Sequence, residues 1–466
     1  MSKFFSRFHK RFVEGPGGLA ELMPIAIPMF FSSMFDMLMM FIDRLFLSRV
    51  GIVHQAAAMS GGTASWMVTS FFVGIVGYSS ALIAQYHGAG QKHNCIRIVN
   101  QALLLSTIFY PLILLTDYIV MLTPVFSGHS PEESVLEIRY FWYMAGGSIL
   151  ALLRFTFGSF FSGIGKTKAI MLGNFAALFV NIFANWVLIF GHLGFPALGL
   201  DGAALGTILS ALSATLILAI TYLRTKRTSA WHDNNPHGFD REKMLKLLRY
   251  GLPQGGENVL GMIGFVFLVS AFHSYGNDVA TATTICFNWD SCSFHPVLGI
   301  QVGVTTLVGR YMGQENPKLA LRAAHSGFFA ALFYTGCMLL LFLVFTHQLV
   351  HLFSPDSAGL DYTGVRQYAI PMLRLCGLYL MTDAIMIISG GVLRGAGDTF
   401  WSMIIHLTNS IIMSGIVVFC VRKLEMQPLQ VWFYFVIMGM LSSSTLFTRY
   451  LMGRWQKLRI IADSKA

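Results

Sequence analysis

The 466-residue sequence is poor in charged residues and in cysteine. Asp, Glu, Lys and Arg make up 12% of it and hydrophobic residues 55%. Soluble domains carry about 25% charged residues, so the low charge excludes an ordinary soluble protein. The six cysteines form no CxxC pair and have no regular spacing, which excludes a disulfide framework or a cysteine-based metal site. We therefore expect a membrane protein with no resident metal ion and no cofactor.

The apolar residues fall into twelve runs, each long enough to cross a bilayer as an α-helix. They cover residues 23–48, 56–86, 98–125, 135–162, 169–192, 202–223, 247–272, 279–312, 321–346, 366–393, 401–421 and 429–452. A polar, charged stretch at 224–246 separates the sixth run from the seventh. This pattern predicts an all-α polytopic membrane protein with two six-helix lobes, residues 1–223 and 247–466, joined by a cytoplasmic linker at 224–246.

The net charge of +10 does not indicate a nucleic-acid partner, because the basic residues lie in short gaps between the apolar runs. With the N-terminus in the cytoplasm, the inner side holds Lys3, Arg7, Lys10, Arg11, Lys92, Lys166, Lys168, Lys318 and the linker cluster. The outer loops hold few basic residues, chiefly Arg49, Arg422 and Lys423. The positive-inside rule then predicts a protein of the plasma (cytoplasmic) membrane with both termini in the cytoplasm.

Three short motifs occur twice, in the same order. They are Pro28 and Pro253, the segments 82–88 (LIAQYHG) and 307–313 (LVGRYMG), and the segments 163–167 (GIGKT) and 395–399 (GAGDT). The first two pairs are 225 residues apart and the third pair is 232 apart. Because each repeat holds an even number of spans, both lobes enter the membrane from the same side. We therefore predict a pseudo-two-fold axis along the membrane normal, with a substrate site between the lobes near the midplane.

The first apolar run contains two acids, Asp36 and Asp43, which are seven residues apart and so share a helix face. A charge near the membrane centre costs about 2.5–3.5 kcal/mol on insertion scales, and such residues usually face a bundle interior or a wet cavity. We expect these carboxylates to bind and release a coupling ion. The alternative for Asp43 is a pair with adjacent Arg44 at the headgroups, although neighbouring residues point about 100° apart on a helix.

The sequence resembles the multidrug and toxic compound extrusion (MATE) transporters over nearly its whole length. The resemblance is carried by Pro28 with Phe41-Ile-Asp43, ALIAQYHGAG (81–90), NIFANWVLIFG (181–191), FPALGLDGAALGT (195–207), TLVGRYMGQENP (306–317) and LRGAGDT (393–399). It implies two six-helix lobes with a V-shaped opening between them. It also implies cation-coupled export of amphipathic, often cationic compounds.

In the first half, the resemblance places Asp43 at the family's first-span aspartate and Asn181 and Asn185 at its fifth-span polar pair. Many members thought to use protons have Asp where this chain has Asn185, so proton carriage would fall mainly on Asp43. The two asparagines are four residues apart on one helix face. They are either interhelical hydrogen-bonding groups or ligands beside Asp43. Carboxylate and amide oxygens suit a transient Na⁺ as well as a proton.

In the second half, the resemblance places Asp383 at the family's tenth-span aspartate. Many members carry Glu where this chain has Gly261, and Glu257 lies one turn earlier, so the resemblance leaves the role of Glu257 open. We include Glu257, Asp290 and Asp383 as candidates for substrate or cation binding.

A polar interruption of the eighth run adds two candidates to that set, Asn288 and Trp289. Asp290 beside Trp289 would form a cation-binding wall by charge and cation–π attraction. The alternative is a structural pair of Asp290 with His295 or with an arginine.

The favoured function is secondary active multidrug export by H⁺ or Na⁺ antiport, by a protein that we expect to be monomeric and not an enzyme. The alternative is a lipid or lipid-linked oligosaccharide flippase, which would need a cationic cavity; Arg154 and Arg374 are the mid-span arginines that could supply it. A major-facilitator carrier would have a basic, aspartate-containing motif between spans two and three, where this chain has HGAGQKHN. No nucleophile–base or metal-ligand grouping points to a membrane enzyme.

Overall fold

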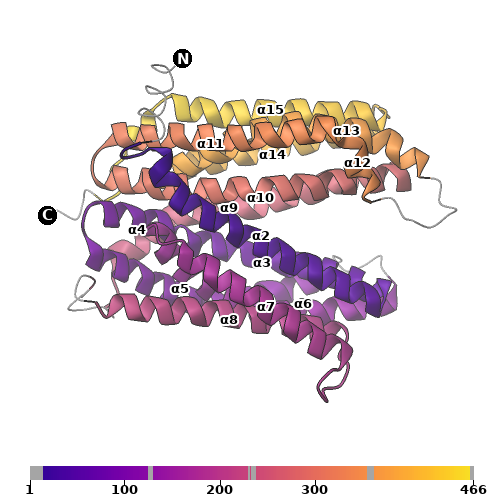
Figure 1. Cartoon of the computed structure of the whole chain (residues 1–466), viewed down its shortest axis with the longest axis horizontal. Coiled ribbons are helices and arrows are strands. Elements are labelled where there is room, and N and C mark those ends of the chain that lie inside the picture. Colours follow the sequence, from indigo (N-terminus) through magenta and orange to yellow (C-terminus); the bar gives the residue numbers. More distant parts are fainter. Residues whose placement is uncertain (1–13, 124–129, 229–230, 232–237, 354–361, 462–466) are drawn as a thin grey trace. The chain divides into compact units, whose positions relative to one another are not determined.

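The computed structural model describes residues 14–123, 130–228, 231, 238–353 and 362–461. These ranges form α-helices joined by short connections (Figure 1). Twelve of the helices described are long and apolar enough to span a membrane, which confirms the predicted all-α polytopic fold. The N-terminal basic residues Lys3, Arg7, Lys10 and Arg11 lie outside the described residues. So do positions 229–230 and 232–237 of the predicted linker.

The spanning helices follow one another along the chain with short loops. Their bounds are α2 (Leu19–Val50), α3 (Ile52–Gly77) continued by α4 (Ser79–Gly88), α5 (Lys92–Met121), α6 (Pro131–Gly163), α7 (Lys168–Phe190), α8 (Leu200–Lys226), α9 (Arg241–His273), α10 (Asn277–Gly313), α11 (Pro317–Val344), α13 (Thr363–Ala396), α14 (Thr399–Arg422) and α15 (Pro428–Leu451). The short α12 (Thr346–His351) follows α11, and the 3-10 turn η4 (Arg454–Lys457) follows α15.

Several helices begin before the apolar run that predicts them, because a polar cap precedes the apolar residues. The fourth run begins at residue 135, but α6 begins at Pro131. Ser130 accepts a hydrogen bond from the backbone N–H of Glu133 at 3.2 Å, and Pro131 occupies the first helical position, where its missing N–H is not needed. A Gly with positive φ ends α7, at Gly191 (φ 76°), and α13, at Gly397 (φ 94°).

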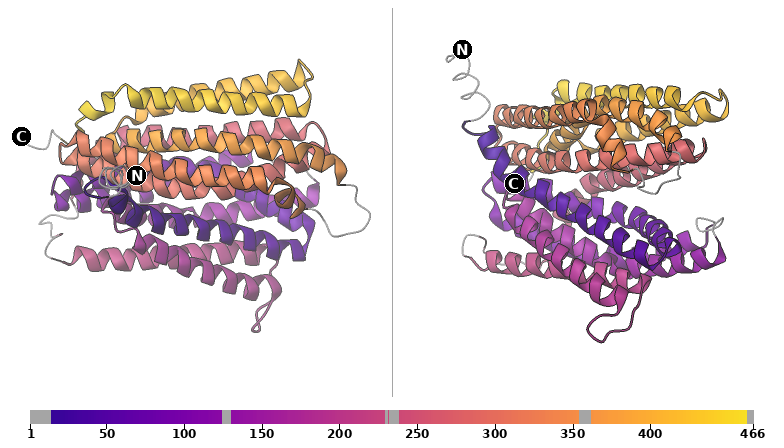
Figure 2. Two further views of the ribbon diagram at one scale, coloured as in Figure 1. Left: turned by 45° about the horizontal axis from the view of Figure 1, so that its top comes forward. Right: turned by 45° about the vertical axis from the view of Figure 1, so that its right-hand side comes forward.

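The chain divides into two compact units whose boundaries fall inside helices. The N unit comprises Ile27–Val259 and Gly309–Glu315, and α7 and α8 run side by side within it (Figures 1 and 2). The C unit comprises the residues up to Ala26, Leu260–Val308 and Asn316–Ile460. These units differ from the predicted lobes at α2, α9 and α10. The first parts of α2 and α9 and the last part of α10 belong to the opposite unit.

The repeated LxxxxxG motifs meet each other within the N unit, at the ends of α4 and α10. A Cβ on Gly88 would collide with the carbonyl oxygen of Arg310, and a Cβ on Gly313 would collide with that of Gln85. Gly88 and Gly313 are 225 residues apart, as are Gln85 and Arg310, so the contact is reciprocal. Only glycine allows backbones to approach this closely.

Two described parts of the linker are attached to the N unit. Trp231 is buried and stacks on His87 with ring centroids 5.9 Å apart and an interplanar angle of 12°. The ammonium group of Lys92 lies 5.7 Å from the same indole ring, within cation–π range. Gln101 Nε2 donates to the carbonyl of Gly238 at 3.1 Å. The described linker residues Trp231 and Gly238 therefore contact α4 and α5 of the N unit.

Asp240 caps the start of α9. Its carboxylate accepts from the backbone N–H of Lys243 at 3.1 Å and from the Lys243 ammonium at 2.6 Å, with Arg97 at 3.9 Å. Burial alone would raise the pKa of Asp240, but the hydrogen bonds and positive charges of Lys243 and Arg97 outweigh it, and the pKa lies below its usual value. The carboxylate is therefore ionised at neutral pH, as a helix N-terminus favours.

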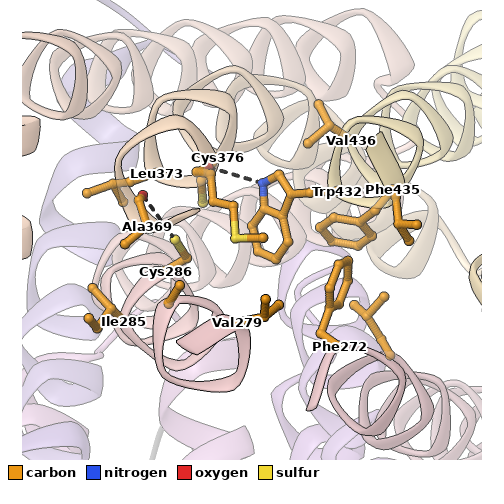
Figure 3. Close-up of a cluster of buried hydrophobic side chains, with 14 of the residues drawn as sticks. Phe272, Val279, Ile285, Cys286, Ala369, Leu373, Cys376, Trp432, Phe435 and Val436 are labelled. Atoms are coloured by element: carbon orange, nitrogen blue, oxygen red, sulfur yellow. Dashed lines mark hydrogen bonds between the residues drawn. The ribbon is translucent and has the colours of Figure 1, made fainter. Parts of the chain in front are cut away.

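The hydrophobic core of the C unit is built around Trp432, which is 1% exposed (Figure 3). Its indole N–H donates to the carbonyl of Met372 at 3.1 Å, and Phe272 and Phe435 lie edge-on or tilted to the ring at 5.1 and 5.4 Å. The indole therefore fills the core without leaving its donor unpaired. Cys376 and Cys286 lie at the side of this core (Figure 3).

Replacing Arg449 with Gln is expected to destabilise the C unit by about 3–5 kcal/mol, because it breaks a buried ion pair. Arg449 donates to both carboxylate oxygens of Asp398 at 2.8 and 3.1 Å, and its guanidinium lies 5.3 Å from the Trp401 ring centre. Thermal unfolding of the purified protein in detergent measures the loss. Gln at the exposed Arg454 is the control, and an equal shift in both variants would contradict the assignment.

Candidate functional site

The first candidate site lies in the N unit, where α2, α7 and α8 meet at Asp43. The Nδ2 group of Asn185 donates a short hydrogen bond to Asp43 Oδ1. Thr207 Oγ1 donates to Asp43 Oδ2 at 3.4 Å, and Asn185 Nδ2 is 3.3 Å from Asn181 Oδ1. Both oxygens of the half-buried Asp43 carboxylate therefore face α7 and α8 rather than the exposed side chain of Arg44.

The local sequence of α8 explains how this site closes around Asn185. A Cβ at Gly206 would collide with Asn185 Oδ1, so glycine lets α8 lie directly against the amide as it is oriented here. Thr207 follows directly and presents its hydroxyl to Asp43. Asn181 and Asn185 are 1% and 0% exposed. Packing thus holds three neutral polar side chains against one carboxylate.

The amides of this site retain unused hydrogen-bonding capacity. Among the described residues, Asn185 Oδ1 has no hydrogen-bond partner, and Asn181 Nδ2 makes no hydrogen bond of normal geometry although it lies near Asp43. A buried polar atom without a partner is costly, so the Asn185 oxygen is open to a further hydrogen-bonding group or ion. The donor set of one carboxylate, two amides and one hydroxyl can hold a proton on Asp43 or offer oxygen ligands to Na⁺.

Asp36, the other acid of α2, lies in a separate network of the N unit. Arg154 of α6 donates to Asp36 Oδ1 at 2.6 Å, and Asn174 of α7 donates to Oδ2 at 3.0 Å. Asn174 also donates to Ser32 Oγ at 2.6 Å. No basic residue lies next to Asp36 in the sequence, and its partner Arg154 is 118 residues further along the chain. The carboxylate charge is therefore compensated.

Asn174 extends the asparagine pair of α7 into a row of three. It precedes Asn181 by seven residues, or two helical turns, so the three amides share the face toward α2. Asn174 is 1% exposed. The seven-residue spacing is visible in the sequence, and it matches the spacing of Asp36 and Asp43. Sequence reasoning overlooked Asn174, and Thr207 as well.

The second candidate site lies in the C unit, where Asp290 of α10 and Asp383 of α13 are close enough to interact electrostatically. Cys376 Sγ lies 3.8 Å from Asp290 Oδ1, and Tyr379, one turn before Asp383, lies within hydrogen-bond reach of it. Asp383 is 3% exposed. Two carboxylates that interact in this way repel each other when both are charged, and a bound cation or proton would relieve that repulsion.

The other second-half candidates do not join Asp290 and Asp383. Trp289 Nε1 donates to the carbonyl of Leu349 at 3.3 Å, and its ring packs edge-on against Phe342 and Phe353. Asn288 is exposed. Its neighbour Trp289 thus makes hydrophobic-core contacts, and the predicted cation–π wall stays a prediction.

His295 contacts its own helix, and Glu257 lies outside the unit that holds Asp290 and Asp383. His295 Nδ1 contacts the carbonyl of Ser291 on its own helix at 2.7 Å, and Asp290 accepts from Cys376 instead. Glu257 is half-buried and belongs to the N unit, whereas Asp290 and Asp383 belong to the C unit.

Asp117 of α5 is a fully buried acid that sequence reasoning did not single out. Among the described residues, neither of its carboxylate oxygens has a hydrogen-bond partner. Asp117 is the one acid in the third apolar run, so the signal used for Asp43 was available. Within the described ranges, no three His, Cys, Asp or Glu residues are grouped so as to hold a metal ion.

Comparison with known proteins gives a consistent result. The MatE family model matches residues 28–187 and 253–418. A probable multidrug resistance protein NorM of Thermotoga maritima is 26% identical over 455 residues, covering 96% of this chain and 95% of the relative. The multidrug resistance protein PmpM of Pseudomonas aeruginosa is 27% identical over 401 residues, covering 84% and 81%.

Solved structures share the fold. A crystal structure of MATE in complex with MaL6 matches with a TM-score of 0.84 at 22% identity, covering 97% of this chain and 98% of that chain. A transporter of the MOP superfamily from Pyrococcus furiosus, described as having a binding pocket of reverse polarity, matches with a TM-score of 0.85 at 22% identity and the same coverage.

Proposed function

Because the chain belongs to the MatE family, we propose that it is a secondary active multidrug exporter, driven by H⁺ or Na⁺ antiport. The relatives named as multidrug resistance proteins support export of drug-like molecules, and we extend this to amphipathic, often cationic compounds. The observation that carries the coupling mechanism is the Asp43 carboxylate, held by Asn185 and Thr207 inside a membrane span.

The coupling step follows from the charge of Asp43. A cation entering from outside neutralises the carboxylate, which changes its hydrogen bonds with Asn185 and Thr207 and so shifts α2 against α7 and α8. Release of the cation to the cytoplasm restores the charge. Each net inward charge gains about 2.3 kcal/mol per 100 mV of membrane potential. One inward ion therefore uses the potential when the exported compound is neutral, whereas a monovalent cationic compound needs a second ion or the ion's own concentration gradient. Asp290 and Asp383 are proposed as acids of the C unit that bind substrate or a cation.

Gradients imposed separately on proteoliposomes are expected to identify the coupling ion. The cationic dye rhodamine 123 serves as the substrate. Either a proton gradient or a Na⁺ gradient, directed opposite to dye movement, should drive the dye against its own concentration gradient. Collapsing the ion gradient should stop transport. Because Asn185 cannot titrate, a proton mechanism in this unit would depend mainly on Asp43. Dye movement that neither gradient changes would refute the proposed antiport.

The flippase alternative needs a concentration of positive charge. Arg154 is paired with Asp36, and Arg374 donates to Thr346 Oγ1 at 3.4 Å in the C unit. The compensated charge of Arg154 does not favour binding a pyrophosphate group. We propose that the protein acts as a monomer in the cytoplasmic membrane with both termini inside.

A further inference from the structure

We propose that the loop joining α7 to α8, residues 191–199, is a membrane anchor that holds Leu193 and Phe195 in the interfacial layer of the lipid bilayer. The loop follows the end of α7 that the proposed topology places outside, so this layer belongs to the outer leaflet. The anchor concerns how the N unit is seated in lipid, and it is independent of the coupling ion and of the exported compound.

The first support is the apolar surface that the loop exposes. The side chains of Leu193 and Phe195 are 68% and 55% exposed. Residues 169–200, which include the loop and nearly all of α7, contain no Asp, Glu, Lys or Arg. In Figure 1 the loop extends beyond the ends of α7 and α8. Exposed apolar surface of this kind marks a membrane or protein contact, because it gains nothing from water.

The second support is a stripe of exposed aromatic side chains on α7 that continues into the loop. The stripe comprises Phe175, Phe179, Phe183 and Trp186, which follow one another at helical spacing on one face, and all four are exposed. Trp186 stacks on His192 of the loop, with ring centroids 4.2 Å apart and an interplanar angle of 11°. An uncharged stripe along a membrane span suits acyl chains, and a Trp at its end suits the interface. Lipid is therefore the one partner that covers both the stripe and the loop.

The third support is the strained turn at the tip of the loop. The backbone N–H of Phe195 donates to the carbonyl of His192 at 3.2 Å, and His192 Nδ1 contacts the carbonyl of Trp186 at 2.8 Å. Between them, Leu193 and Gly194 have φ angles of 56° and 84°. Leucine is unfavourable at positive φ, where Gly, Asn or Asp is usual. A leucine at this position, with its side chain largely exposed, indicates a contact outside the chain.

The test measures what surrounds the loop in proteoliposomes of the full-length protein. A nitroxide label is attached at Leu193→Cys or at the matched position Leu424→Cys, a 55% exposed leucine flanked by charged residues in the loop between α14 and α15. Both variants carry Cys337→Ala, because Cys337 is exposed, and Cys337→Ala alone gives the background. Electron paramagnetic resonance then compares collisions with oxygen, which concentrates in lipid, and with the water-soluble complex NiEDDA. The oxygen-to-NiEDDA ratio should be roughly tenfold higher at Leu193→Cys, since burying one apolar side chain of this size is worth a factor of that order.

Two further variants separate lipid contact from backbone strain. With the label at Phe195→Cys, Leu193→Asp should move the loop toward water and lower the oxygen-to-NiEDDA ratio, because a charged side chain is unfavourable at an apolar interface. Leu193→Asn should lower the ratio less, because it adds no charge. Asp and Asn both tolerate positive φ, so neither variant should lower the unfolding midpoint in detergent. A change in the ratio then reports the surroundings of the side chain and not a misfolded loop.

Two results would overturn the membrane anchor. Equal ratios at Leu193→Cys and Leu424→Cys would place the α7–α8 loop in water. Low accessibility to both oxygen and NiEDDA at Leu193→Cys would show that protein covers the loop, either from this chain or from a second copy, because the proteoliposomes contain no other protein. Gradient-driven efflux of rhodamine 123, alongside either result, would leave the proposed export function standing.

Discussion

Asp43→Asn is expected to reduce gradient-driven efflux of rhodamine 123 from proteoliposomes at least about a hundredfold, while the protein still folds and binds the dye. The amide can neither take up a proton nor offer a charged ligand to Na⁺, so one half of the exchange cycle is lost. The fold should survive because an amide can still hydrogen-bond with Asn185 and Thr207, and because removing an intramembrane charge is itself favourable.

The exchange variant Asp43→Asn/Asn185→Asp provides a sharper test of the same site. It moves the carboxylate across the hydrogen bond from α2 to α7 and keeps the pair intact. We expect it to recover part of the efflux lost in Asp43→Asn. Glu132→Gln, an exposed acid at the start of α6, is the control for loss of a charge in the same unit. Normal efflux in Asp43→Asn would remove Asp43 from the mechanism.

Alanine at Gly88 or Gly313 is expected to destabilise the protein by at least about 3 kcal/mol. Each new Cβ would collide with a backbone carbonyl oxygen, of Arg310 or Gln85, and a backbone atom cannot move aside as a flexible side chain can. Overpacking of well-packed sites typically costs about 1–3 kcal/mol, occasionally more. The cost here is expected at the upper end, because the added Cβ meets a backbone carbonyl oxygen. The unfolding midpoint in detergent is the measurement.

The reciprocity of the contact adds a second expectation. Because both glycines support one contact, the double variant should lose less stability than the two single variants added together. Gly158→Ala, in a span of the same unit where a Cβ would meet nothing within 4 Å, should not destabilise. Additive losses, or equal losses at Gly158, would show that the two repeats do not meet through these glycines.

The spans were predictable because hydrophobic length is a local property. Twelve runs predicted twelve spanning helices, with errors mainly at the ends, where polar caps such as Ser130 extend the helix beyond the apolar run. The division into units was not predictable in the same way. The first turns of α2 and α9 pack with the opposite unit. Tertiary contacts decide this packing, and the hydrophobic pattern of the sequence does not indicate it.

The candidate site was predictable where its residues share one helix. Asp43 follows from the cost of an intramembrane acid, and Asn181 with Asn185 from their spacing. Thr207 and Arg154 reach Asp43 and Asp36 from 164 and 118 residues away, so their roles depend on how the helices pack. Asn174 and Asp117 differ from these, because helical spacing and intramembrane charge mark them in the sequence itself.

Counter-ion flow into proteoliposomes tests the central claim most directly. A pH-sensitive dye or a Na⁺ tracer reports ion movement across the membrane. Adding rhodamine 123 to one side of proteoliposomes that contain the wild type should drive H⁺ or Na⁺ in the direction opposite to rhodamine movement. Asp43→Asn should bind the dye and move neither ion. Ion movement in Asp43→Asn equal to that of the wild type would contradict the account.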